Sequence, residues 1–198
     1  MSRVAIADRR PDALEIAGAG LLTAAGLGLL LLRPALVSDS TRPLIALSIC
    51  YAALAAVSTV TPAGIEGSRA RLPVGWVLAA GLAAVLAARL LVPAAIPGAV
   101  GPAAVRPAAV ALTAVAAVAE EAFFRRFLYG WLSLRSEALA VAGSALLFAA
   151  VHLPAYGAAA LPVDLGAGLL LSWQRWASGD WRTSAATHVF ANLLAVIP

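Results

Sequence analysis

Residues 107–134, PAAVALTAVAAVAEEAFFRRFLYGWLSL, form an apolar run with charged residues inside it. This run is long enough to cross a bilayer as a helix, since about 20 apolar residues span the hydrocarbon core. Glu120, Glu121 and Arg125 nevertheless lie near its middle. Charged side chains are costly inside a membrane and usually face the interior of a helix bundle. The run therefore predicts a membrane-spanning helix with one face turned to an internal polar site.

The composition of the whole chain agrees with a membrane protein. Of the 198 residues, 62% are apolar and only 12% are charged, about half the charged share of an average soluble domain. This composition excludes a soluble globular domain, and it excludes a disordered chain, which would be poor in apolar residues. We therefore predict an all-α fold, a polytopic bundle of transmembrane helices.

Seven apolar runs follow one another along the chain. They cover residues 16–32, 43–65, 72–91, 107–134, 138–153, 157–173 and 183–196. We predict one span from each run, about seven in all, because the chain is too short to add a soluble domain to them. Pro154 is expected to end the fifth helix, since proline disrupts the helical hydrogen-bond ladder.

The arginines predict how the helices are oriented. All 14 basic residues are Arg, and with a cytoplasmic N-terminus ten of them lie in or beside inner loops. Arg33, Arg42 and Arg106 then lie in outer loops. Because positively charged loops tend to stay in the cytoplasm, we predict a cytoplasmic N-terminus and an external C-terminus.

The same arginines account for the net charge of +4 without nucleic acid as a partner, because they lie between apolar blocks and form no basic stripe. The chain is rich in Ala and Arg and contains no Lys, which is typical of proteins from G+C-rich bacterial genomes. We therefore expect an integral protein of a bacterial cytoplasmic membrane, surrounded by the lipid bilayer. The single cysteine, Cys50, excludes a disulfide framework within the chain.

Three short polar motifs lie on separate apolar runs in the second half of the chain. In chain order they are Glu120-Glu121-x-x-x-Arg125, Phe148-x-x-x-His152 and His188-x-x-x-Asn192. Both histidines of the protein belong to this set. Residues four apart share one face of a helix, so each motif is expected to present its side chains to one space.

Helical spacing also predicts different surroundings for the two adjacent carboxylates. Glu121 and Arg125 are one turn apart and can form an ion pair. Glu120 lies about 100° further round the helix axis and is left for another partner. Phe148, one turn before His152, can pack against the imidazole ring.

The residue types in the three motifs are those that hydrolysis requires. A carboxylate beside an imidazole can take a proton from water and make the water a nucleophile. A second imidazole and an amide N–H can donate hydrogen bonds to a developing oxyanion. Peptide-bond hydrolysis fits this set. The alternative is that a Glu–Arg ion pair and His/Asn hydrogen bonds only hold helices together.

Together, EExxxR, FxxxH and HxxxN resemble the signature of the CAAX protease and bacteriocin-processing enzyme family (CPBP, or Abi). These intramembrane endopeptidases include the type II prenyl-protein CAAX proteases. The resemblance covers residues 108–192. It implies a single membrane domain, residues 1–198, with N-terminal helices in residues 1–107 and a catalytic core in residues 108–198. Nothing in the sequence indicates prenylation, so the expected substrate is a peptide or a membrane-protein tail.

The resemblance also implies a role for each of four motif residues. Glu120 would be the base that activates water, with His152 assisting. His188 and Asn192 would form the oxyanion site. The family has also been described as metal-dependent, and Glu120, His152 and His188 would make a His₂Glu zinc set. We favour the mechanism in which glutamate activates water and no cofactor takes part.

The other motif residues would support the site: Glu121 and Arg125 would shape it or hold substrate, and Phe148 would pack against it. Two other classes of function remain open on the sequence. One is a non-catalytic membrane protein of the same fold, such as a bacteriocin-immunity or scaffold factor, which would tolerate loss of Glu120. The other is a small transporter or proton channel that uses the same residues as a relay, although no internal repeat supports it.

Overall fold

The computed structural model describes residues 11–60, 70–91 and 107–196. Its elements are α1 (Ala13–Ser38), α2 (Pro43–Val57), α3 (Val74–Leu91), α4 (Pro107–Glu121), the π-helix η1 (Ala122–Leu128), α5 (Tyr129–Ser133), α6 (Glu137–Tyr156), the 3₁₀ turn η2 (Ala158–Ala160), α7 (Leu161–Ser178) and α8 (Trp181–Val196). The segments α4, η1 and α5 form one continuous rod, Pro107–Ser133. Within these ranges there is no strand, and seven helical rods confirm the predicted all-α membrane bundle.

Four of the described helices are long and apolar enough to cross a membrane, by length and composition. They are Ala13–Ser38, Val74–Leu91, Pro107–Ser133 and Glu137–Tyr156. The helix α2 is apolar but has only 15 residues, while α7 and α8 carry buried Ser, Thr, Gln and His side chains. The seven predicted runs therefore correspond to seven helices, of which four have the composition of independent spans.

The distribution of side chains is the reverse of that in a soluble protein. Leu14, Leu21, Trp76 and Leu90 are all at least 74% exposed. The interior, by contrast, contains two carboxylates, two arginines and both histidines. A bilayer explains both observations, since lipid surrounds the apolar surface while charged groups avoid lipid by facing inward.

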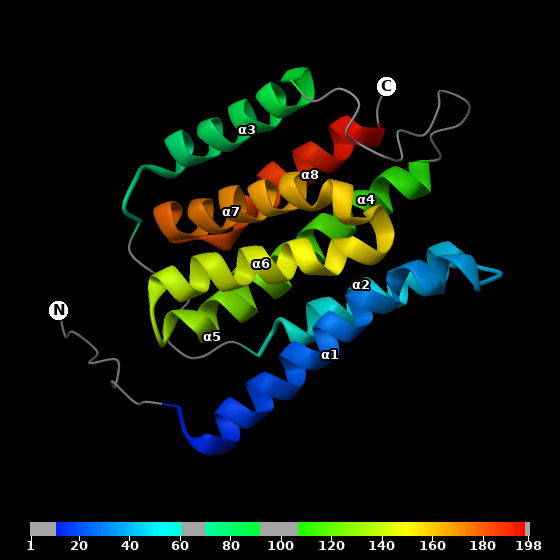
Figure 1. Cartoon of the computed structure of the whole chain (residues 1–198), viewed down its shortest axis with the longest axis horizontal. Helices are drawn as coiled ribbons and strands as arrows, with labels where there is room; N and C mark the ends of the chain where they lie inside the picture. The colour runs from blue at the N-terminus through cyan, green and yellow to red at the C-terminus, as the bar shows by residue number, and fades with distance from the viewer. Residues whose placement is uncertain (1–10, 61–69, 92–106, 197–198) are drawn as a thin grey trace.

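Of the three N-terminal helices, α2 packs directly against the rod that carries EExxxR. Figure 1 shows α1 and α2 as a hairpin on one side of the bundle and α3 on the opposite side. The helix α2 contacts α4, α1 contacts α6, and α3 contacts both α7 and α8. Between them, α6 packs against α7 and α4 packs against α8. The predicted division into residues 1–107 and 108–198 stays a prediction.

Two helix ends differ from the sequence prediction. The first apolar run indicated an end at residue 32, but α1 continues through Pro34 to Ser38. The predicted place of Arg33 in an outer loop was therefore wrong. The helix does not need to stop before this arginine, because its side chain pairs with a carboxylate inside the bundle.

The predicted end of the fifth helix at Pro154 was also wrong, because α6 includes this proline and runs to Tyr156. Proline is tolerated in membrane helices where neighbouring groups satisfy the backbone around it. Gly157 then ends the helix with a φ of 76°, a conformation that costs glycine nothing sterically. The second helix ends at Val57, well before the predicted residue 65; residues 61–69 lie outside the described ranges.

Close packing of α6 against α7 depends on Gly168. A Cβ atom at this position would lie 2.8 Å from the carbonyl oxygen of Ala145 and 3.1 Å from its Cα, so the two helices would have to separate. We expect Gly168→Ala to lower the free energy of unfolding by about 1–3 kcal/mol. Gly166→Ala is the matched control, because no atom lies within 4 Å of its Cβ position. Equal thermal unfolding of the two purified variants would contradict this packing.

The orientation in the membrane stays a prediction that reporter fusions can test. Alkaline phosphatase folds to an active enzyme only outside the cytoplasm, so a C-terminal fusion should be active. A green fluorescent protein fused at the same place should be dark when exported. The opposite pair of results would reverse the predicted topology.

Candidate active site

The EExxxR motif lies where the helix geometry changes. Glu120 and Glu121 are the last residues of α4, and the following seven residues form the π-helix η1. π-Helical turns are rare and frequently lie at functional sites. Within η1, the carbonyl of Arg125 accepts a hydrogen bond from Nε of Arg175 on α7, at 3.1 Å. A tertiary contact of this kind can stabilise an irregular turn that the sequence AFFRRFL does not predict.

Glu121 is the centre of a fully buried charge network. Its Oε1 accepts hydrogen bonds from Nη1 of Arg125 at 2.8 Å and from Nδ1 of His188 at 2.9 Å. The Glu121 and Arg125 side chains are both 0% exposed. Nη2 of Arg125 also donates to the Gly168 carbonyl at 2.9 Å. The pair expected from the i, i+4 spacing is present, and it joins η1 to α7 and α8.

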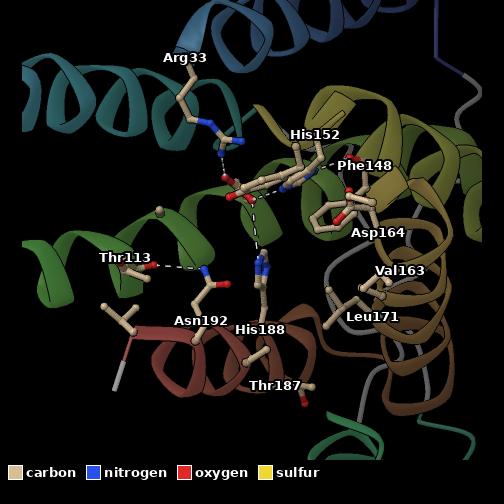
Figure 2. A pocket seen from close by; sticks show the side chains of 18 of the residues that line it. Arg33, Thr113, Phe148, His152, Val163, Asp164, Leu171, Thr187, His188 and Asn192 are labelled. Atoms are coloured by element: carbon tan, nitrogen blue, oxygen red, sulfur yellow. Dashed lines mark hydrogen bonds and ion pairs between the residues drawn. The ribbon is translucent and has the colours of Figure 1, made fainter. Parts of the chain in front are cut away.

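Glu120 faces a different set of groups, as its position round the helix predicts. Its Oε1 lies 2.7 Å from Nη1 of Arg33 on α1. Its Oε2 lies 3.9 Å from Nε2 of His152 on α6 and 4.0 Å from Nε2 of His188 on α8. Figure 2 shows Arg33, His152 and His188 converging from three helices. The structure thus brings together the carboxylate and both histidines that the motifs singled out.

Both histidines are oriented by a bond at the far side of the ring. Nδ1 of His152 donates to the carbonyl of Phe148 at 2.7 Å, and Nδ1 of His188 donates to Glu121. In the neutral form, each ring therefore directs the lone pair of Nε2 toward Glu120. His188 can donate from Nε2 only as an imidazolium ion, which is a condition that the sequence did not indicate.

Phe148 packs against both imidazoles. Its ring centroid lies 4.6 Å from that of His152 and 5.6 Å from that of His188. The guanidinium carbon of Arg125 lies 4.6 Å from the centre of the same ring, on its face, where a cation is attracted to the aromatic π-system. Phe148 therefore restricts the positions of three polar side chains, beyond the single contact with His152 that the spacing predicts.

A cavity of about 530 Å³ opens beside these groups. Its lining comes from all seven helical rods, in the part of the bundle near the α1–α2 and α6–α7 turns. Asn192 lines the cavity, and its amide donates to the Thr113 carbonyl at 3.5 Å. No hydrogen bond joins Asn192 to His188 or Glu120 among the described residues, although all three border the same space.

Three polar residues of the cavity were missed by sequence reasoning. Arg33 is expected in an outer loop from the sequence, and neither Tyr51 nor Asp164 belongs to any of the three motifs. Nη1 of Arg33 also donates to the Tyr51 hydroxyl, at 3.3 Å. Asp164, on α7, borders the cavity beside His152. The available signal was a charged residue at the edge of an apolar run, which does not distinguish an interfacial anchor from an internal partner.

Zinc is the metal that the donor set would suit by chemistry. Each Nδ1–H donates to an oxygen, the Phe148 carbonyl or the Glu121 carboxylate, as the non-ligating N–H of a zinc-binding histidine does. Arg33, however, pairs with Glu120 and adds a positive charge there. Within the described ranges, no group of three or more His, Cys, Asp or Glu side chains is close enough to hold a metal ion. The expectation that no cofactor takes part stays a prediction.

The comparison with known families agrees with the motifs and the fold. Residues 102–194, just under half of the chain, match the family model described as type II CAAX prenyl endopeptidase Rce1-like. No curated protein and no solved structure matches the chain. The matched residues include the three motifs and end two residues after Asn192. The match therefore supports the CAAX protease family for residues 102–194, the part of the chain that contains the site.

Proposed function

We propose that this protein is an intramembrane endopeptidase in which Glu120 activates water for attack on a peptide bond. The observation that carries the proposal is the position of Glu120 Oε2 at 3.9 and 4.0 Å from the two Nε2 atoms. Separations of this size suit a water molecule hydrogen-bonded to the groups on both sides. The substrate is a peptide or a membrane-protein tail, and the protein acts in a bacterial cytoplasmic membrane.

In the first step, Glu120 Oε2 takes a proton from water while the water oxygen attacks the carbonyl carbon of the scissile bond. A C–O bond forms, and the electron pair of the C=O bond moves to its oxygen. The neutral His152 ring accepts a hydrogen bond from the same water through Nε2, which orients it. Glu120 then returns its proton to the leaving nitrogen as the C–N bond breaks.

The oxyanion requires donors on the opposite side of the water. His188 supplies one as an imidazolium ion, with Nδ1–H on Glu121 and Nε2–H directed into the cavity. Asn192 supplies another, since its amide has two N–H donors and, among the described residues, makes one long hydrogen bond, to Thr113. Removing one oxyanion donor typically lowers kcat by about 10²–10³-fold, so these two residues carry much of the proposed rate enhancement.

A cleavage assay tests the proposal. The purified protein, in liposomes, is incubated in H₂¹⁸O with a peptide library, and products are identified by mass spectrometry. We expect new C-termini that carry one ¹⁸O atom, and none with Glu120→Ala. Peptide binding without cleavage, unchanged by Glu120→Ala, would instead support a non-catalytic immunity or scaffold protein.

We also expect the reaction to be independent of zinc. The proposed role of His188 excludes zinc, because Nε2 would have to present its lone pair to the metal and could not then donate a proton to the oxyanion. Elemental analysis of the purified protein should therefore find no stoichiometric zinc, and activity should survive prolonged chelation. Near one zinc per chain, with activity lost on removal and restored by zinc alone, would make Glu120 a ligand and overturn the glutamate mechanism.

A further inference from the structure

We infer that Arg33 is a positioning residue of the active site, holding one oxygen of Glu120 so that the other faces both histidines. The inference rests on the proposed function. It extends the site to α1, which lies outside the family-matched residues 102–194. Arg33 and Glu120 are 87 positions apart in the chain, so only the packing of the helices brings them together.

The geometry of the contact favours one orientation of the carboxylate. Nη1 of Arg33 lies 2.7 Å from Oε1 of Glu120, while Oε2 remains on the side of the imidazoles. Rotation of the carboxylate would exchange the two oxygens and would have to break this charge-assisted hydrogen bond, which is stronger than a neutral one. The Tyr51 hydroxyl accepts from the same Nη1 and restricts the guanidinium in turn.

The charges of the two buried glutamates are compensated by arginines in both cases. Each of the two adjacent carboxylates has its own arginine: Glu121 pairs with Arg125 from the next turn, and Glu120 pairs with Arg33 from another helix. The Glu120 side chain is only 4% exposed, and without Arg33 none of the cationic groups described near it would lie within hydrogen-bond distance of its carboxylate. Such a carboxylate can move or recruit water, and a misplacement of about 1 Å can cost about 100-fold in rate.

Arg33 does not itself contact the reacting atoms in this scheme. Its guanidinium lies on Oε1, on the far side of the carboxylate from the two Nε2 atoms that border the proposed water position. Its loss should therefore lower kcat and leave substrate binding nearly unchanged. A residue that only supported the fold would lower the amount of active enzyme without this selective effect on each active molecule.

The test compares Arg33→Met, Arg33→Lys and the control Arg42→Gln, with active-site concentration fixed by the folded fraction. Arg42 is an exposed arginine at the start of α2. We expect Arg33→Met to lower kcat about 100-fold with KM within about threefold. Arg33→Lys should recover most of the lost kcat, because lysine keeps the positive charge. The recovery should be incomplete, because lysine lacks the planar guanidinium fork. Arg42→Gln should match wild type.

A stability measurement tests the contact independently of activity. Arg33→Met should lower Tm by on the order of 10 °C, since it leaves a buried carboxylate unpaired. Adding Glu120→Gln should recover most of this loss, because the uncompensated charge is then removed. Additive changes in Tm, or wild-type kcat in Arg33→Met, would overturn the inference. An active Glu120→Gln enzyme would instead overturn the proposed function, so the two failures are distinguishable.

Discussion

Glu120→Gln is expected to lower kcat for peptide cleavage by about 10³-fold while the protein remains folded. General base catalysis contributes roughly 10²–10⁴-fold to enzymatic rates, and an amide cannot take the proton. Glutamine keeps Oε1 as an acceptor for Arg33, and the Arg33 side chain is 13% exposed to the cavity, so the remaining charge can be solvated. The fold should therefore lose less stability than after substitution of Glu121.

The activity of Glu120→Gln is to be compared with that of Glu137→Gln. Glu137 lies at the other end of the bundle, where it forms an ion pair with Arg71 and accepts a hydrogen bond from the indole of Trp176. Its side chain is 53% exposed. This control changes the same functional group at a distance from the cavity, and its kcat should equal that of wild type. Retention of more than a tenth of wild-type kcat by Glu120→Gln would remove Glu120 from the role of base.

Glu121→Gln is expected to have the largest effect on stability. The substitution removes the charge that compensates Arg125, whose side chain is 0% exposed, and it weakens the bond that orients His188. Breaking a buried ion pair by removing one partner costs about 3–5 kcal/mol, because the other charge is left uncompensated. Thermal unfolding in detergent should show this loss relative to wild type.

Two variants make the interpretation specific. Glu137→Gln breaks an exposed ion pair and should cost no more than about 1 kcal/mol. The double substitution Glu121→Gln with Arg125→Met should be more stable than Glu121→Gln alone, because no buried charge remains unpaired. If Glu121→Gln were stable but inactive, and Glu120→Gln unstable but active, the roles of the two carboxylates would be exchanged.

Several features of the fold and the site could be predicted from the sequence. Apolar runs long enough to span a bilayer predict membrane helices, because the backbone in lipid must satisfy its own hydrogen bonds. The i, i+4 spacing of Glu121 and Arg125 predicts their ion pair, and the spacing of Phe148 and His152 predicts their contact. These predictions succeed because both partners lie on one helix, whose periodicity is set locally.

Other features depend on contacts that no local pattern contains. The residues of η1 would also fit a regular α-helix, so its wider turn could not be predicted from them. The Arg125 carbonyl within η1 accepts its hydrogen bond from Arg175 of α7, a distant part of the chain. The bond from His188 to Glu121 depends on the rotation of α8 against α4. Because Nδ1 of His188 donates its proton in this bond, Nε2 can donate only when the ring is an imidazolium ion. The proposed oxyanion role of His188 therefore depends on this contact.

Composition and helical period are properties of single segments, so the residues alone predict a helical membrane protein with three motif-bearing helices. Helix packing, by contrast, makes Glu120 face His152 and His188 together and lets Arg33 of α1 pair with Glu120. A charged side chain at the end of an apolar run can be stabilised either by water at the interface or by an opposite charge inside the bundle. Which of these occurs depends on the helix packed beside it.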